Sequence, residues 1–267
     1  MNRINYILAK CYQGQKIKGV ELGPNILSKF LGYGQTSIST ELFDTNEGYK
    51  QIKNKVTESL RNNYTPITIG GDHSVSIGSV SGALDYYKND LTLVWVDAHA
   101  DINTKLSSNS GSLHGMPISY LTGLSKPLFN DFNKRLSLKN IVYLGIRDVD
   151  RYESLIIDNY SIKYLTSKDL ADTKLLDTIK IDTNNIHMSI DVDVLDPEYM
   201  TSTGTSVHNG ISMNTLETII NWIKKQGNVV SADLVEFNPL IGTLEEVNTS
   251  LESCRKIIDI LEDKQIP

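Results

Sequence analysis

The sequence predicts an α/β fold of three layers (α/β/α), in which helices cover both faces of a mainly parallel central sheet. Apolar runs of strand length alternate along the chain with segments whose apolar residues recur every three to four positions. The strand-like runs are nearly continuous in apolar residues, as expected of strands buried on both faces. The length of 267 residues allows one large domain or two ordinary ones. Because no linker, repeat or low-complexity tract interrupts the chain, we expect a single domain over residues 1–267.

Six runs rich in Ile, Val, Leu and Tyr are expected to be strands, at residues 5–10, 66–70, 91–96, 141–145, 186–190 and 229–234. Five segments with apolar residues on one face are expected to be helices, at residues 48–60, 77–87, 167–179, 215–225 and 251–262. Ser167 and Ser212 are expected to cap two of these helices, since a serine hydroxyl accepts unpaired N–H groups of a first turn. Residues 103–115, rich in Ser, Asn and Gly, are expected to form a long ordered loop.

Composition limits the class of protein. Hydrophobic residues make up 40% and charged residues 22% of the chain, a balance typical of a globular protein with a core. The net charge of −6 argues against a nucleic-acid partner, because general nucleic-acid binders carry a basic excess. The same acidity is compatible with a cationic substrate.

The sequence also predicts a compartment. Cys11 and Cys254 have no metal-type spacing, so we expect two buried thiols in a reducing environment. The apolar run before Lys10 is too short for a signal peptide. No window is apolar enough to span a membrane. We therefore expect a cytoplasmic protein with no membrane partner.

Four polar clusters each follow directly on a predicted strand. They are Gly71-Asp72-His73-Ser74, Asp97-Ala98-His99-Ala100-Asp101, Asp191-Val192-Asp193 and Val235-Glu236-Phe237-Asn238-Pro239. In open parallel sheets, ligands bind at the carboxyl ends of the strands, so these clusters are expected to meet at one edge. Taken singly, each has an ordinary interpretation as a turn with a capping residue or as a strand end. Their joint occurrence favours a functional site.

The acidic residues of these clusters predict metal ions. Asp97, Asp101, Asp191 and Asp193 would repel one another at a buried edge unless cations compensated them. A pair of divalent ions fits two Asp-rich motifs with two histidines. Oxygen and imidazole donors without thiolate favour Mn²⁺ over Zn²⁺, Co²⁺ or Fe²⁺, although they do not determine the metal. In an extended segment, residues two positions apart point to the same side. Each Asp-rich motif could therefore turn all its polar groups to one side.

With these motifs the sequence resembles the arginase/agmatinase ureohydrolase family. The matching motifs are spread over most of the chain, at residues 19–24, 70–74, 97–103, 110–115, 145–150, 189–197, 203–205 and 236–239. The resemblance implies an arginase-like α/β domain that holds two Mn²⁺ per subunit. It implies that His73, Asp97, Asp101 and Asp191 hold the first ion. It implies that His99, Asp97, Asp191 and Asp193 hold the second, with Asp97 and Asp191 bridging.

The resemblance also implies the substrate contacts. The α-carboxylate and α-amino group would be held by Asn103, Ser110, Ser112 and Asp150, with Glu153 and Thr205 as further candidates. Ser112 stands where the family commonly has Asn. Arg151 and Tyr152 replace a Pro-Gly pair before Glu153. Glu236 matches the acid that faces the guanidinium group, and His114 matches the proton-shuttling histidine.

The implied reaction converts L-arginine to L-ornithine and urea. A hydroxide that bridges the two metals would attack the guanidinium carbon, while Glu236 holds the guanidinium by charge-assisted hydrogen bonds. Asp101 would keep the hydroxide in line, and His114 would pass a proton to the leaving amine. The resemblance further implies a homotrimer or homohexamer.

Three alternatives remain at this stage. One is an agmatinase or another guanidino-compound ureohydrolase, although the Asp-Ile-Asn-Thr and Ser-Gly-Ser-Leu-His-Gly runs favour a grip on an α-carboxylate. The second is a catalytically silent metal-binding paralogue. The third is a two-metal phosphoesterase, for which the sequence offers no cluster of basic residues near the site.

Overall fold

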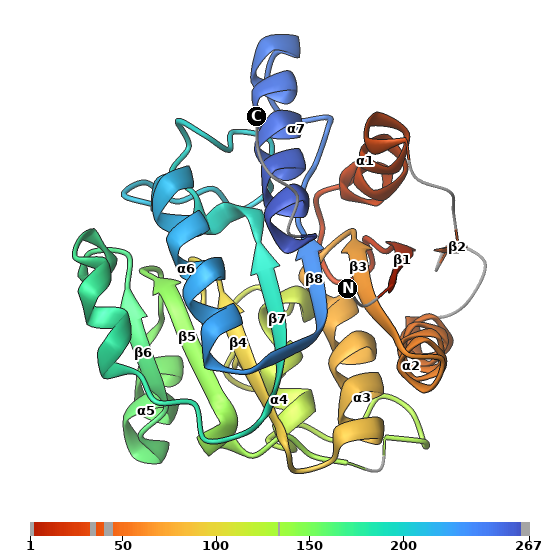
Figure 1. Cartoon of the computed structure of the whole chain (residues 1–267), viewed down its shortest axis with the longest axis vertical. Helices are drawn as coiled ribbons and strands as arrows, with labels where there is room; N and C mark the ends of the chain where they lie inside the picture. The colour runs from red at the N-terminus through yellow and green to blue at the C-terminus, as the bar shows by residue number, and fades with distance from the viewer. Residues whose placement is uncertain (1–2, 33–35, 40–44, 133, 263–267) are drawn as a thin grey trace.

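A computed structural model of the protein describes residues 3–32, 36–39, 45–132 and 134–262, and for residues 36–39 and 45 only the backbone. Its centre is an eight-stranded sheet in the order β2-β1-β3-β8-β7-β4-β5-β6, with every pairing parallel (Figure 1). The strands are β1 Arg3–Lys10, β2 Thr36–Ser39, β3 Tyr64–Gly70, β4 Leu91–Val96, β5 Ile141–Ile146, β6 Lys163–Thr166, β7 Asn185–Asp191 and β8 Asn228–Val235. All six predicted strands are present, and the mainly parallel sheet is confirmed.

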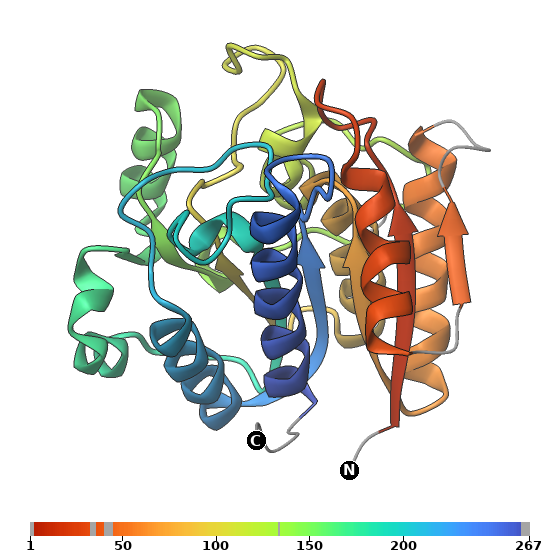
Figure 2. The same cartoon turned by 90° about the horizontal axis from the view of Figure 1, so that it is seen from above.

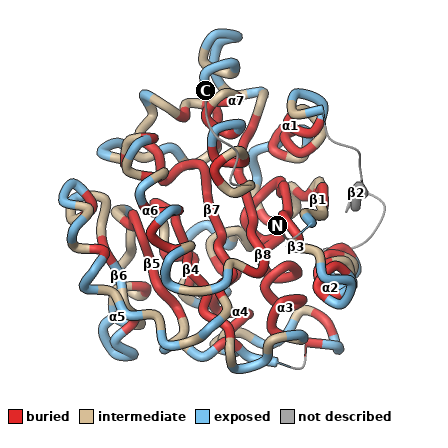
Figure 3. The backbone as a smooth tube through the Cα atoms, in the orientation of Figure 1, coloured by how far each residue is buried: buried red, intermediate tan, exposed pale blue. Residues whose placement is uncertain are grey.

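Helices cover both faces of this sheet. One core layer includes residues of α1 (Gly23–Leu31), α6 (Met213–Gln226) and α7 (Leu244–Leu261). The other includes residues of α2 (Thr45–Arg61), α3 (Ser76–Tyr87), α4 (Pro117–Thr122) and α5 (Arg151–Tyr160). Figure 2 shows the sheet between these two groups, and Figure 3 shows that the central strands are buried along most of their length. The predicted three-layer α/β/α fold is therefore confirmed.

Helix α6 shows how the local sequence produces its element. Ser212 precedes the helix, and its hydroxyl accepts the backbone N–H of Thr215 at 3.1 Å. Leu216, Ile219 and Ile223 recur at helical spacing and are fully buried against the sheet. Both the helix and the cap predicted at Ser212 are confirmed.

The helix predicted at residues 167–179 is wrong. The segment forms two 3₁₀ helices, Asp169–Ala171 and Thr173–Thr178. Between them Asp172 is extended, and its side chain accepts the backbone N–H of Lys174 at 3.1 Å. Leu170 and Leu176 are buried, which accounts for the helix-like spacing in the sequence. Ser167 caps nothing, since Lys168 occupies the N-cap position of the first turn.

The strands β3, β8, β7 and β4 are neighbours at the centre of the sheet and point the same way. The four polar clusters follow them, and the long loop after β4 rises above the arrowheads (Figure 2). The expectation from the spacing of Asp97, His99 and Asp101 is that the residues after β4 continue as an extended strand. The structure shows that they do not. β4 ends at Val96, and Asp101 has a left-handed φ of 51°.

Two further expectations concern the whole chain. Cys11 and Cys254 are both buried, and no disulfide joins them. Within the described ranges, every helix is too short or too polar to span a membrane.

Candidate metal centre

The first group of predicted ligands meets around one nitrogen of His73. Its Nδ1 lies 3.0 Å from Asp97 Oδ2, 3.2 Å from Asp191 Oδ2 and 3.4 Å from Asp101 Oδ2. His73, Asp97 and Asp191 are buried, and Asp101 is nearly so. The structure therefore brings together all four residues predicted for the first ion.

A second group lies beside the first and shares Asp97 with it. His99 Nδ1 is 3.4 Å from Asp97 Oδ1 and 3.2 Å from Asp193 Oδ2. Asp97 thus turns one carboxylate oxygen to each group, as a bridging ligand would. Asp97 Oδ1 also accepts the backbone N–H of His99 at 2.7 Å, and Asp191 Oδ1 accepts that of Asp193 at 2.9 Å, so the bridges through both residues stay predictions.

The donor atoms suit a cation. His73 Nε2 lies 2.9 Å from Ser189 Oγ, and the ring stacks on Trp95 with centroids 3.8 Å apart. When Nε2 donates to Ser189, Nδ1 carries the lone pair that faces the carboxylates. In the described chain, His73 Nδ1 and Asp97 Oδ2 are buried without any hydrogen-bond partner. Since orphaned buried polar atoms are costly, a divalent ion between them fits this site.

The electrostatics of the cluster lead to the same conclusion. Burial raises the pKa of Asp191 well above its usual range, and Asp193 and Asp97 add to the rise. Burial and Asp97 do the same to the pKa of Asp101. Burial lowers the pKa of His99, but Asp193 and Asp97 outweigh it and raise that pKa strongly. The cluster therefore attracts positive charge, which bound cations would supply.

Glu236 lies at the end of β8, where its φ of 70° turns the chain off the strand. Its Oε1 accepts the backbone N–H of His73 at 2.8 Å and lies 3.2 Å from His114 Nδ1. Its Oε2 accepts a hydrogen bond from Gln15 Nε2 at 2.7 Å. His114 belongs to the 3₁₀ helix Leu113–Gly115, and its backbone N–H donates to Gly14 O at 3.0 Å. Sequence reasoning found Glu236 and His114 but missed Gln15.

The charges of this pair depend on each other. Burial alone would raise the pKa of Glu236, but the hydrogen bond and charge of His114 lower it overall. Burial alone would lower the pKa of His114, but Glu236 raises it overall. The contact thus favours an ionised carboxylate next to a protonated imidazole.

A cavity of about 260 Å³ opens above the metal residues. Of the residues predicted to bind substrate, those that line it are Asn103, Ser110, Asp150, Glu153 and Thr205. Ser112 and Glu236 are not part of its lining, but Glu236 contacts the lining residue His114. Asp148 lines the cavity as well and was not predicted, although it lies within the family-like motif at residues 145–150.

Helix α5 begins at the wall of this cavity with a capping box. Asp150 Oδ1 accepts the backbone N–H of Glu153 at 2.9 Å, and Glu153 Oε2 accepts that of Asp150 at 3.1 Å. Glu153 Oε1 also accepts the backbone N–H of Ile102 at 3.2 Å. Burial raises the pKa of Glu153 to about 7. The capping box thus determines where Glu153 points, despite the unusual residues that precede it.

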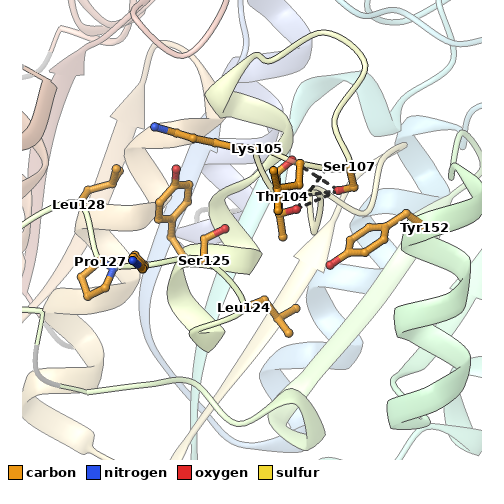
Figure 4. Close-up of a pocket in the computed structure, with 11 residues that line it drawn as sticks. Thr104, Lys105, Ser107, Leu124, Ser125, Pro127, Leu128 and Tyr152 are labelled. Atoms are coloured by element: carbon orange, nitrogen blue, oxygen red, sulfur yellow. Dashed lines mark hydrogen bonds between the residues drawn. The ribbon is translucent and has the colours of Figure 1, made fainter.

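The loop after β4 separates this cavity from a second one of about 780 Å³ (Figure 4). Thr104, Lys105 and Ser107 form one wall of the second cavity, and Leu124 and Tyr152 lie opposite. Among the residues that the structure describes, no acid or imidazole lines this space. The smaller cavity, by contrast, is lined by five acidic residues and two histidines.

Comparison with known proteins places the chain in a family. Residues 12–261 match the model of the Arginase family. The chain is 35% identical to the arginase of Coccidioides immitis over 80% of its own length and 71% of the relative's. It is 34% identical to arginase-1 of Sus scrofa, over 96% and 91% of the two chains. The crystal structure of Entamoeba histolytica arginase in complex with L-ornithine matches it with a TM-score of 0.85 at 28% identity, covering 98% of each chain. The chain therefore belongs to the arginase family of hydrolases.

Proposed function

We propose that the protein hydrolyses L-arginine to L-ornithine and urea. The observation that carries this proposal is a pair of adjoining groups, His73/Asp97/Asp191 and Asp97/His99/Asp193, buried except for the half-buried His99, beside an acidic cavity. The relatives named arginase support the same reaction, and one of them was crystallised with L-ornithine.

We propose two Mn²⁺ per subunit, because the donors are carboxylates and imidazoles without thiolate. The first would be held by His73, Asp97, Asp101 and Asp191. The second would be held by His99, Asp97, Asp191 and Asp193. When bound, such a metal pair acts as a Lewis acid that makes a water acidic enough to ionise near neutral pH.

The side chains around the proposed metal pair would bind the guanidinium group, accept hydrogen bonds and transfer a proton. Glu236 offers a buried carboxylate that can accept charge-assisted hydrogen bonds from a guanidinium group. Asp101 lines the cavity and offers a second acceptor, which could take a hydrogen bond from the reacting water. His114 lines the cavity with Nδ1 turned to Glu236, which leaves Nε2 to pass a proton to the leaving amine.

The two ends of arginine carry positive charge, and the cavity matches both. We propose that Asp150 and Glu153 accept the α-ammonium group, together with Asp148. Asn103, Ser110 and Thr205 would hold the α-carboxylate as polar groups of the lining, although Thr205 Oγ1 also donates to Asp193 Oδ2 at 2.9 Å.

Agmatine is the second candidate substrate, because the carboxylate grip is incomplete. Ser112 does not line the cavity. The amide of Asn103 already donates to Asp150 Oδ2 at 2.7 Å. A substrate without a carboxylate would lose little here, so the two substrates must be compared directly.

The test combines metal analysis with a urea-release assay on L-arginine and on agmatine. We expect two Mn²⁺ per chain and faster turnover of L-arginine. Faster turnover of agmatine would replace the proposal with an agmatinase. Bound metal with no urea from any guanidino compound would show a silent metal-binding paralogue.

Three broader proposals come from the sequence and the family resemblance. They are a single domain over residues 1–267, assembly as a homotrimer or homohexamer, and a cytoplasmic location. Light scattering on the purified protein measures the assembly.

A further inference from the structure

We infer that Gln15 is a positioning residue, which holds the Glu236 carboxylate in place for a guanidinium group and so sets the preference for guanidinium substrates. This inference rests on the proposed function, in which Glu236 accepts the guanidinium. Gln15 Nε2 donates to Glu236 Oε2 at 2.7 Å, across 221 residues of sequence. Gln15 does not line the substrate cavity, so it acts through Glu236.

The contacts of Glu236 explain why Gln15 is needed. Oε1 is held by the backbone N–H of His73 at 2.8 Å and lies 3.2 Å from His114 Nδ1. Over the part of the chain that the structure describes, Gln15 is the one donor to Oε2. The last torsion of a glutamate side chain is broad, so a carboxylate held at one oxygen alone can rotate. The bond from Gln15 therefore fixes the plane of the carboxylate.

The backbone next to Gln15 is itself tied to the site. Gly14 N donates to Asp72 Oδ2 at 2.8 Å, and Gly14 O accepts the backbone N–H of His114 at 3.0 Å. A Cβ at Gly14 would lie 2.5 Å from Asp72 Oδ1, so only glycine allows this approach. The loop is thus bound to the turn before His73 and to the proton-shuttle segment, and it presents Gln15 to Glu236 from a fixed base.

The plane of the carboxylate matters for one kind of ligand. Oε1 already faces two donors, so Oε2, which accepts from Gln15, is the oxygen with a lone pair left for an ion pair with a guanidinium N–H, and that lone pair lies in the plane of the carboxylate. An amino acid that ends in an alkyl group makes no such pair. Loss of Gln15 is therefore expected to weaken the binding of guanidinium substrates and to leave unchanged the binding of ligands held only by their α-groups.

The test uses Gln15→Met, which keeps the side-chain length and removes the donor. We expect KM for L-arginine to rise about tenfold, as for a lost hydrogen bond to a charged group. We expect kcat to stay within about threefold, because the interaction is made in the ground state as well. The inhibition constant of L-norvaline, which keeps the α-groups and has a propyl side chain, should not change. Gln226→Met, at the exposed end of α6, is the matched control.

Each result of these measurements either supports or overturns the proposed role of Gln15. Unchanged KM in Gln15→Met would overturn it while leaving the proposed function intact. Equally weakened binding of L-arginine and L-norvaline would also overturn the inference, because such a result would show a general structural role of Gln15. Wild-type protein that releases no urea would overturn both. If Gln15→Met does not fold, Gln15→Asn gives the same readings, since its amide is one methylene too short to reach Glu236 Oε2.

Discussion

At the scale of single residues, the proposed function assigns one group of side chains to the metals and another to the substrate. Asp97 is fully buried and turns one oxygen to each histidine. Burial raises its pKa, but His73 and His99 outweigh burial, and the pKa falls well below the usual range. Asp97 thus carries its negative charge at neutral pH even in the interior. We therefore expect substitution of a metal-site residue and substitution of a substrate-site residue to have different effects on metal content and turnover.

Asp191→Ala and His114→Ala separate the two groups. Asp191→Ala removes a carboxylate 3.2 Å from His73 Nδ1, so we expect loss of bound metal and of turnover together. His114→Ala leaves the metal groups untouched, so metal content should stay normal. Turnover should fall about 10²- to 10⁴-fold, the usual contribution of a proton-transfer residue. Metal analysis and urea release on the same samples measure both. Loss of metal in His114→Ala would contradict this division.

Glu153 should give substrate binding a pH dependence. Its pKa is raised to about 7 by burial, so the carboxyl group is neutral below that pH and ionised above it. An ionised Glu153 attracts the α-ammonium group, whereas a neutral one does not. We therefore expect KM for L-arginine to fall as the pH rises from about 6 to about 8. In Glu153→Gln this fall should largely disappear; a KM profile identical to that of the wild type would refute the assignment.

Most site residues could be predicted because they stand in compact motifs directly after apolar strands, as Asp97, His99 and Asp191 do. Gln15 could not, because it stands in no recognisable pattern, whereas Asp148 lies within the motif at residues 145–150 but was given no role. Gln15 meets Glu236 only through the fold. Ser112 is a different case: its motif predicted a substrate contact, and because it does not line the cavity, that contact stays a prediction.

At the scale of elements, the ends of β1 and β3 must lie unusually close for the site to form. Gly71 N donates to Ala9 O at 2.8 Å, and Asp72 N donates to Cys11 O at 2.9 Å. A Cβ at Gly71 would lie 1.9 Å from Cys11 O, closer than any real contact. The backbone before His73 therefore requires glycine for space.

Gly71→Ala should push these two strand ends apart. We expect the free energy of unfolding to fall by about 3 kcal/mol, the upper range for overpacking, and metal binding to weaken sharply. Gly32→Ala is the control: its φ is 72°, but nothing lies within 4 Å of the added Cβ. That variant should lose only about 1 kcal/mol to backbone strain and keep its metal. Urea unfolding and calorimetric metal titration distinguish the two.

The position of a helix or strand in the fold explains whether the sequence could predict it. The six predicted strands fill the middle of the sheet, where burial on both faces makes their sequences continuously apolar. The two missed strands, β2 and β6, are four-residue strands at the two edges. Helices α1, α4 and α5 were also missed. In α5 the signal was present, because Asp150 and Glu153 have the spacing of a capping box.

At the scale of the whole molecule, the metal pair and the fold should stabilise each other. The cluster gathers four carboxylates whose mutual repulsion opposes folding. We expect removal of metal by a chelator to lower the melting temperature, and added Mn²⁺ to restore it, because the ions bind the folded state. Differential scanning calorimetry measures the shift. In Asp191→Ala, Mn²⁺ should produce almost no shift; a shift as large as in the wild type would place the stabilising ions elsewhere.

The position of β8 has a consequence for how a new chain matures. All the proposed metal ligands come before residue 194, yet β8, the last strand, lies between β3 and β7 and separates His73 from Asp191 along the sheet. A nascent polypeptide that has emerged only as far as Asp193 carries every donor but lacks the strand that sets their spacing. We therefore expect metal binding to follow completion of the sheet, after β8 has been added.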